Sequence, residues 1–344
     1  MKIVGCDFHP SFQQIAVLDT VRGEIEQRRL CHGDGEAEQF YQSLEAAALI
    51  GMESVGNSLW FEQLMARLGH ELWIGDAAQI RASYVRRQKT DRRDAGHILR
   101  LLVEQRFARI WVPSSAQRDV RQLLLHRHKL VQMRTRVKTE LQHLAMNQGM
   151  QKKRHLWSVR GRADFKNLCL APWAAQRRED LLSVLSLVES QVEKLDVAVE
   201  ELAGGDRQAR LLMSQPGVGP ITALAFAVTI GDVSRFKRGK QVASYLGLIP
   251  AERSSGDKRR LGSISKQGNT FLRTMLVEAA QSACRYDEQF RREYRRRCHP
   301  KPKGVAKVAA ARKLAVRLYW MRRTQTPYAP AVHNEGSSSH SVAG

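Results

Sequence analysis

The sequence predicts a mixed α/β domain, then a long helical region, then a mostly helical C-terminal domain. Over positions 1–112, short apolar stretches alternate with turn residues, which is typical of strands and helices built around one sheet. From position 114 onward glycine and proline become scarce, and apolar residues recur at steps of three and four, which indicates long helices. We therefore expect four segments, with the bounds 1–112, 113–204, 205–325 and 326–344.

The first segment contains the expected sheet. Strands are predicted at 3–7, 14–19 and 24–31, and the turn at Arg22-Gly23 joins the last two, which favours an antiparallel meander. Two further strands are expected at 48–53 and 71–74. Helices are expected at 36–47, 59–68 and about 92–104.

The second segment has a heptad pattern. Its apolar residues are spaced alternately by four and three over three heptads, which predicts a coiled-coil seam formed by Leu181, Leu185, Val188, Val192, Leu195, Val199 and Leu202. A second long helix is expected over 119–145. Two interpretations are equally open: a helical hairpin within one chain, or a helix pair that joins chains into a homo-oligomer, a dimer or tetramer.

The third segment begins after the linker Gly204-Gly205 and opens with a helix pair over 212–230. The turn at 216–220 breaks this pair. The final segment, 326–344, is rich in Ser, Gly, Ala and Pro, and we expect it to be disordered.

The charge of the chain indicates a polyanionic partner. Lys and Arg number 56 against 34 Asp and Glu, a formal net charge of +22. Between Glu252 and Gln325 there are 20 Lys and Arg and 6 Asp and Glu, so the third segment carries most of this excess. Such an excess favours binding to DNA or RNA, since phosphate contacts supply much of that affinity. The alternative is a charge that serves solubility, or a ribosome-like basic protein.

Other bulk features point to the cytoplasm, in association with the nucleoid. The five cysteines include no CxxC pair, which argues against a disulfide framework and a zinc site. No apolar run reaches about 18 residues, so no membrane span is expected.

Four carboxylates have placements that suit chemistry. Asp7 ends the first predicted strand and Glu53 ends a later one, while Asp91 and Asp94 lie three apart near the start of a predicted helix. Thr90 is the expected cap of that helix. Strand ends in one sheet can present two carboxylates side by side, and a helix packed on the sheet can supply the other two.

Such a set of oxygen ligands is what phosphodiester chemistry with one or two Mg²⁺ ions needs. The arrangement is that of ribonuclease H-like nucleases, including the RuvC resolvase. The structural alternative is that these residues cap turns or pair with neighbouring arginines. His9 and His97 lie close to the carboxylates in sequence, and for them we favour supporting or purely structural roles over metal binding or proton transfer.

The order of these carboxylates resembles that of the DEDD insertion-sequence transposases, the IS-one-ten family. The C-terminal stretch strengthens the resemblance, which extends over residues 1 to about 325. It rests on the runs Pro216-Gly217-Val218-Gly219-Pro220-Ile221-Thr222-Ala223, Ala243-Ser244-Tyr245-Leu246-Gly247-Leu248-Ile249-Pro250, Ser254-Ser255-Gly256 and Leu261-Gly262-Ser263-Ile264-Ser265-Lys266-Gln267-Gly268-Asn269.

The resemblance implies a fold and a mechanism. The first domain is expected to be RuvC-like and the third to be the family's C-terminal transposase domain. Family members use a bridge RNA to choose donor and target DNA, and a serine that becomes joined to a DNA phosphate. Ser255 corresponds best to this nucleophile, with Ser254 as the alternative. The carboxylates and Mg²⁺ share the serine's composite site, which forms between subunits of an oligomer.

Several residues around this serine are expected to contact nucleic acid. The cations suited to phosphate contacts are Lys258, Arg259, Arg260, Lys266 and Arg273. The glycines of the 216–220 turn, Gly217 and Gly219, either present backbone N–H groups to a phosphate or serve only a tight turn between helices.

Two other functions remain open. One is a RuvC-like Mg²⁺-dependent nuclease that cuts by water attack. The other is a non-catalytic nucleic-acid-binding protein, which would need no such set of carboxylates.

Overall fold

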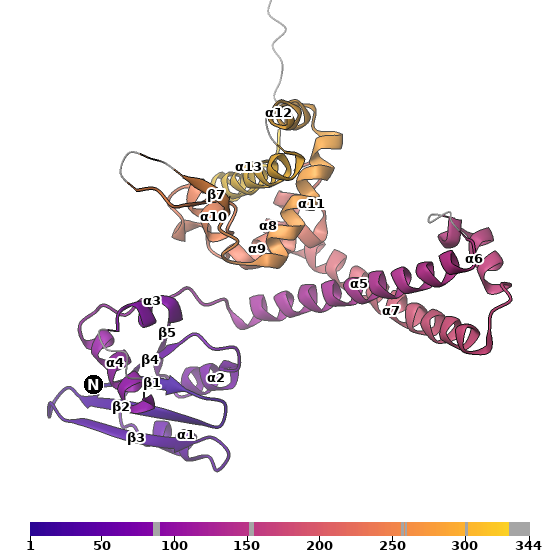
Figure 1. The fold of residues 1–344 in the computed structure, drawn as a ribbon. Coiled ribbons are helices and arrows are strands. Elements are labelled where there is room, and N and C mark those ends of the chain that lie inside the picture. Colours follow the sequence, from indigo (N-terminus) through magenta and orange to yellow (C-terminus); the bar gives the residue numbers. More distant parts are fainter. Residues whose placement is uncertain (85–89, 151–154, 256–257, 259, 300–301, 330–344) are drawn as a thin grey trace, which may run out of the picture. The chain divides into compact units, whose positions relative to one another are not determined.

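The computed structural model describes residues 1–84, 90–150, 155–255, 258, 260–299 and 302–329. Within it the chain forms two compact units, Met1–Val112 and Pro113–Gly344. The N-terminal unit contains a five-stranded sheet with helices, and the C-terminal unit is almost entirely helical (Figure 1). The expected boundary at 204/205 falls inside the second unit.

The sheet of the N-terminal unit has the strand order β3-β2-β1-β4-β5. Its first three strands pair antiparallel, which confirms the predicted meander, whereas β4 runs parallel to both β1 and β5. The strands are β1 (Lys2–Phe8), β2 (Phe12–Asp19), β3 (Ile25–Cys31), β4 (Leu49–Glu53) and β5 (Glu71–Gly75).

Helices cover the two faces of this sheet. Side chains alternate across a strand, so Val4, Cys6 and Phe8 share one face of β1, where the helices α1 (Glu36–Gln42) and α2 (Leu59–Arg67) pack. On the opposite face, Ile3 packs against α4 (Asp91–Val103). The short helix α3 (Ala77–Ala82) contributes to the core on this second face.

Two glycines bring α4 close to the sheet. A Cβ atom at Gly5 would lie 2.3 Å from the carbonyl oxygen of Ala95 and 2.4 Å from the backbone nitrogen of Leu99. At Gly51, on the neighbouring strand, it would lie 2.7 Å from the Leu102 side chain. Gly5 therefore allows a helix–sheet distance that no larger residue would permit, whereas at Gly51 a larger residue would require the Leu102 side chain to shift.

One helix is shorter than expected. The sequence predicts a helix to position 47, but α1 ends at Gln42. Both the backbone N–H and the hydroxyl of Ser43 donate hydrogen bonds to the Phe40 carbonyl oxygen, which closes the last turn.

A helical hairpin begins the C-terminal unit. Its long helices are α5 (Ser115–Asn147) and α7 (Pro172–Gly205), which lie side by side (Figure 1). The capping box of Ser114 and Gln117 starts α5. Between the two helices come η1 (His155–Trp157) and α6 (Val159–Lys166).

The predicted apolar seam of α7 packs mainly within the chain. Leu185 shares a core with residues of α5 such as Leu141, and Val199 shares a second core with Leu124. Lys138 and Glu189 add an ion pair of 2.5 Å between the helices. A hairpin within one chain thus accounts for the heptad pattern, and oligomer formation remains a prediction.

Among the remaining elements, α8 and α11 pack against α9, which is buried along its whole length except at its first two residues. A two-stranded antiparallel sheet, which the sequence did not predict, interrupts this helical part. The elements are α8 (Arg207–Met213), α9 (Pro220–Ile230), η2 (Val233–Arg235), α10 (Gly239–Tyr245), β6 (Pro250–Glu252), β7 (Leu261–Ile264), α11 (Thr270–Tyr286), α12 (Glu288–Cys298) and α13 (Lys303–Thr324).

The segment after α13 was expected to be disordered from position 326. Tyr328, however, is held in place, because its backbone N–H donates to the Ser214 hydroxyl and its own hydroxyl donates to Asp287. Positions 330–344 lie outside the described residues. Within the described part of the chain, no helix has the length and apolar character needed to span a membrane.

Candidate metal-binding and catalytic site

Strand register places two of the predicted carboxylates side by side. In the parallel pair β1–β4, Gly5 lies opposite Gly51 and Cys6 opposite Met52, so Asp7 and Glu53 follow at the same level. Each carboxylate lies two residues after a glycine that contacts α4. Because side chains alternate, both carboxylates point to the α4 face of the sheet.

The other two carboxylates come from the first turn of α4. The Thr90 side chain caps this helix by accepting a hydrogen bond from the backbone N–H of Arg93, as the sequence predicts. Asp91 is the first helical residue and its side chain is half exposed, whereas Asp94, one turn later, is buried. The close packing of α4 on Gly5 and Gly51 directs this turn toward the strand ends.

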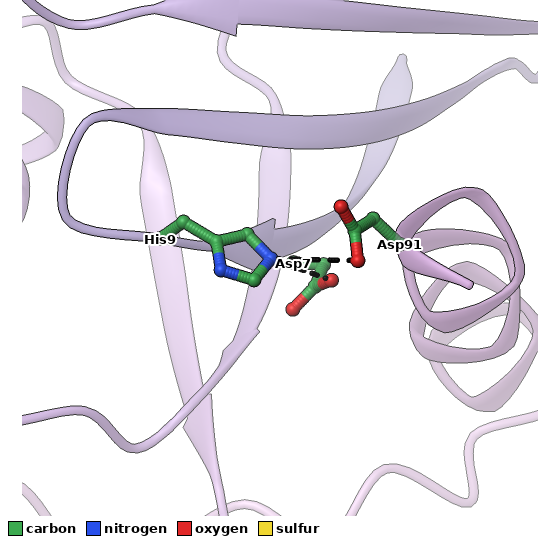
Figure 2. Close-up of side chains that lie close together, drawn as sticks. All are labelled: Asp7, His9 and Asp91. Atoms are coloured by element: carbon green, nitrogen blue, oxygen red, sulfur yellow. Dashed lines mark hydrogen bonds and ion pairs between the residues drawn. The ribbon is translucent and has the colours of Figure 1, made fainter. Parts of the chain in front are cut away.

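His9 joins the two sides of the cluster. Its Nε2 atom lies 3.2 Å from Oδ2 of Asp7 and 3.7 Å from Oδ1 of Asp91 (Figure 2). The imidazole ring also stacks on Phe12, with 4.6 Å between ring centroids. His9 therefore lies where a proton or a cation would be shared between the two carboxylates.

The electrostatics of Asp7 reflect this crowding. Burial raises the pKa of Asp7 above its ordinary value, the proximity of His9 lowers it, and the charges of Asp94 and Asp91 raise it again. The net effect is a raised pKa, because desolvation and two nearby negative charges outweigh one imidazole. A bound cation would relieve this cost.

Tyr84 lies against the buried side of the same cluster. Its hydroxyl donates a hydrogen bond of 2.8 Å to Oδ1 of Asp94. Burial, this hydrogen bond, and the charges of Asp94, Glu53 and Asp7 together raise the pKa of Tyr84. The charges that act on the Tyr84 phenol thus include those of three of the four predicted carboxylates.

The donor set fits a hard divalent cation. Ligand atoms of Asp7, His9 and Asp91 all lie within 4.8 Å of one another, and carboxylate oxygens are the ligands such ions prefer. Glu53 and Asp94, the other two predicted carboxylates, are not members of this group of three. A second group of residues with similar spacing, Cys31, Asp34 and Glu36, lies apart from it and is mostly exposed.

The sequence analysis favoured a supporting or structural role for His9, which stays a prediction, and it did not single out Tyr84. The period of two along an extended chain gives a signal for His9, since it places positions 7 and 9 on one side. No comparable signal exists for Tyr84, because its contact with Asp94 depends on the path of the chain between α3 and α4. His97, which lies near the carboxylates in sequence, contacts the Tyr84 ring in a tilted arrangement with centroids 4.1 Å apart.

The two serines lie in the C-terminal unit, in the loop between β6 and β7. Both are exposed, but their environments differ. The Ser254 hydroxyl donates to Oε1 of Glu252 at 2.7 Å and accepts from the backbone N–H of Arg260 at 3.2 Å. The Ser255 carbonyl oxygen accepts from the Lys258 N–H, and its hydroxyl makes no hydrogen bond among the described residues.

The predicted phosphate-binding cations near the serines fall into two groups. Lys258, Arg260 and Lys266 are exposed. Arg273, in contrast, donates to the carbonyl oxygens of residues 246 and 267, so its guanidinium joins two loops of the protein. Arg259 lies outside the described residues, as do Gly256 and Asp257.

The glycines of the 216–220 turn also differ from each other. Gly217 has a φ of +86°, and a Cβ atom there would lie 2.3 Å from the backbone nitrogen of Ala283 in α11. This glycine meets the needs of a tight turn packed on another helix. Gly219 is exposed, and a Cβ atom there would meet nothing within 4 Å, so space for a phosphate exists beside it.

Comparison with known proteins agrees with the site. The sequence model of the DEDD transposases, described as "Transposase", matches residues 4–148, and that of the "Transposase IS116/IS110/IS902 family" matches residues 209–295. Together these matches take in more than half of the chain and both units. The chain belongs to the IS110 family of DEDD transposases.

Two relatives of this IS110-family chain carry the name transposase and match most of its length. The chain is 29% identical over 341 residues to the "Probable family 20 transposase" of Pseudomonas aeruginosa, covering 95% of this chain and 98% of the relative. It is also 29% identical over 300 residues to the "Transposase for insertion sequence element IS1111A" of Coxiella burnetii, covering 83% and 79% respectively. DNA is therefore the substrate of this transposase.

Proposed function

We propose that this transposase cleaves and rejoins DNA strands with the help of Mg²⁺ at the N-terminal carboxylates and of Ser255 as the nucleophile. The observation that carries the proposal is the meeting of Asp7 and Asp91 around His9 in a family of DEDD transposases. A sheet with three antiparallel strands followed by two parallel ones supports a RuvC-like, ribonuclease H-like fold for this unit.

Asp7, Glu53, Asp91 and Asp94 would hold one or two Mg²⁺ ions. The ions, when bound, activate an attacking oxygen and stabilise a leaving one on a phosphodiester. The protein's own contribution is to fix the ligands: β1 and β4 hold Asp7 and Glu53, and α4 holds the two aspartates. Tyr84 orients the Asp94 carboxylate through its hydrogen bond.

Ser255 would perform the covalent step. Its hydroxyl loses a proton to a nearby base, its oxygen forms a bond to a DNA phosphorus, and the bond from that phosphorus to a deoxyribose oxygen breaks. The released oxygen takes up a proton, and reversal of these steps with another strand end rejoins the DNA. A serine needs such activation to act as a nucleophile. The exposed Lys258 and Arg260 are suited to neutralise charge on the phosphate.

The choice of Ser255 over Ser254 is supported by their contacts. The Ser254 hydroxyl is held by Glu252 and by the backbone N–H of Arg260, which fits a role in shaping the loop. The Ser255 hydroxyl has no such engagement among the described residues, so it is available to a substrate. The cations of the loop and the open side of Gly219 would position the DNA backbone.

We further propose that a bridge RNA guides the reaction and that the protein acts as a homo-oligomer. The net charge of +22 supports binding of more than one nucleic acid. Apolar residues left exposed along α7, such as Leu187 at 62% and Val197 at 52% exposure, support contact with a second chain.

The deciding experiment compares Ser255→Ala with Ser254→Ala in the full-length protein, using DNA that contains the ends of the element. Covalent protein–DNA products are detected after denaturation, and joined DNA is measured separately. We expect Ser255→Ala to abolish both products and Ser254→Ala to keep a measurable fraction of both.

Two outcomes would contradict the proposal. If Ser255→Ala still joins strands at the wild-type rate, the serine mechanism is wrong. If Ser255→Ala still cuts but forms no covalent product, the enzyme is a nuclease that uses water attack. Purification of the wild-type protein with its bound nucleic acid, followed by sequencing, tests the RNA: recovery of no defined transcript rejects the guide.

A further inference from the structure

A broad groove lies along α4 in the N-terminal unit, with a volume of about 1060 Å³. One side is formed by the exposed face of α4, and the other by Leu18 of β2 and by Ile25 and Gln27 of β3. Tyr84 and His97 also line the groove, so it reaches the region where the carboxylates converge.

The charge of the groove is strongly positive. Four exposed arginines line it, against one acidic residue, Glu104, which pairs with Arg106 at 3.0 Å. The other three arginines, Arg92, Arg93 and Arg100, all belong to α4. A concave surface with this balance of charge attracts a chain of phosphates.

The spacing of these arginines suits an extended ligand. Arg92 and Arg100 are eight positions apart, with Gly96 midway, so all three lie on one face of α4. At a rise of 1.5 Å per residue, the two arginines are about 12 Å apart along the helix axis. This length corresponds to roughly three or four nucleotides at about 3.4 Å each.

Gly96 is not required by the fold. A Cβ atom at this position would meet only the Gln27 side chain, at 3.6 Å, which is an ordinary contact. Glycine within a helix costs about 0.5–1 kcal/mol relative to alanine. At Gly5 the close packing of α4 explains why the fold accepts the cost of a glycine. At Gly96 no such packing exists, and the position lines the groove. A backbone of nucleic acid lying close to α4 explains this glycine.

We propose that this groove holds the sugar–phosphate backbone of a DNA strand and leads it to the carboxylates. The claim that the groove leads to the carboxylates rests on the proposed function. It follows because α4 carries the groove's arginines and also, in its first turn, Asp91 and Asp94. DNA is favoured as the occupant because it is the substrate of the family. The exposed apolar side chains of Ile25 and Val103, which are also lining residues, suit contact with deoxyribose.

The test measures DNA binding by full-length variants. The probe is a fluorescent DNA duplex of arbitrary sequence, and its anisotropy is followed in EDTA over a range of salt concentrations. We expect the double variant Arg92→Gln with Arg100→Gln to bind roughly tenfold more weakly, with a salt slope that falls by about 0.9 for each phosphate that the protein no longer neutralises. Arg67→Gln is the matched control, since Arg67 is exposed on α2, on the opposite face of the sheet.

Gly96→Ala supplies a second variant that avoids any change of charge. Alanine is the better helix former, so we expect no loss of thermal stability together with a several-fold loss of DNA affinity. DNA that carries 4-thiothymine adds a positional readout: we expect photo-crosslinks to peptides from β3 and α4. These crosslinks separate the groove from the basic C-terminal unit.

Three outcomes would overturn the inference: a double variant that binds DNA like Arg67→Gln, an absence of crosslinks to β3 and α4, or a loss of affinity confined to an RNA duplex of the same sequence. A separate variant, Asp7→Asn, tests the proposed function independently of the groove. Asp7→Asn should bind the DNA normally in EDTA, and if it also cleaves DNA normally, the carboxylate mechanism fails while the groove stands.

Discussion

The hydroxyl of Tyr84 donates a 2.8 Å hydrogen bond to Oδ1 of Asp94, although the two residues come from different sides of the connection between α3 and α4. Asp94 is buried, and this bond holds its carboxylate in one orientation. The Tyr84 ring also contacts the His97 ring in a tilted arrangement. Tyr84 and Asp94 therefore position each other beside the predicted carboxylates.

Tyr84→Phe removes this hydrogen bond while keeping the ring. We expect a 10- to 100-fold loss of metal affinity or strand cleavage, about the size found when a residue that orients a ligand is lost. Calorimetric titration with Mn²⁺ or Mg²⁺ and the cleavage rate are the two measurements. Tyr286→Phe, at an exposed position of α11, is the control. Equal metal affinity in both variants would mean that Tyr84 serves only the fold.

Mg²⁺ should stabilise the wild-type protein against heat. The carboxylates repel one another without a cation, so an ion that binds only the folded state adds about 2.7 kcal/mol at a hundred times its dissociation constant. Asp7→Asn should abolish this dependence of the melting temperature on Mg²⁺, whereas Glu45→Gln, at an exposed position, should keep it. A magnesium effect that survives Asp7→Asn would place the ion elsewhere.

Gly5→Ala should disrupt the packing of α4 on the sheet. The added methyl group would overlap the backbone of Ala95 and Leu99, which we expect to cost about 1–3 kcal/mol of folding free energy. Cleavage should fall further than stability does, since Asp91 and Asp94 move with the helix. Chemical denaturation and cleavage rates test this, with Gly33→Ala as a control in open space. An active Gly5→Ala variant of normal stability would contradict the packing argument.

Asp287 should make the C-terminal unit sensitive to acid. Burial acts to raise its pKa, but hydrogen bonds from the Phe290 N–H, Arg317 and Tyr328 outweigh burial and lower it. A lowered pKa in the folded state means that the stabilisation is complete above the unfolded pKa, about 3.9, and is lost as the pH falls through the folded value.

Asp287→Asn removes that charge. We expect a loss of about 2 kcal/mol at neutral pH, which shrinks as the pH falls below about 4. Melting temperatures of wild type and variant over this pH range provide the measurement. Asp180→Asn, on the exposed surface of α7, should change stability little at any pH. If the difference in melting temperature between wild type and Asp287→Asn stays constant down to about pH 3, the ionised Asp287 carboxylate is not the cause of the lost stability.

Much of the N-terminal unit could be predicted from the sequence. Short apolar stretches between turn residues predicted the five strands, and the structure places Asp7 next to the last residue of β1 and Glu53 at the end of β4. The Thr90 cap and the three-residue spacing of Asp91 and Asp94 predicted the start of α4. These are local signals, and local periodicity was sufficient to find them.

Other features could not be predicted because they depend on tertiary contacts. The parallel pairing of β1 with β4 depends on a crossover connection and on a register that no local pattern encodes. The Tyr84 contact has the same origin. In the C-terminal unit, the Arg273 guanidinium looked suited to DNA, but the fold uses it to bind two backbone carbonyls. The hydrogen-bond partners of an arginine become visible only once the loops around it are placed.

The glycine-lined contact between the sheet and α4 also has a consequence for the order of events during synthesis. β1 and β4 leave the ribosome well before residues 91–103, and N-terminal parts of a chain begin folding first. Asp7 and Glu53 can take their places side by side early, but Asp91 and Asp94 join them only when α4 emerges and docks on Gly5 and Gly51. If these four carboxylates hold the metal as proposed, a partly made transposase has only half of them in place, and cutting of DNA waits for the helix that completes the unit.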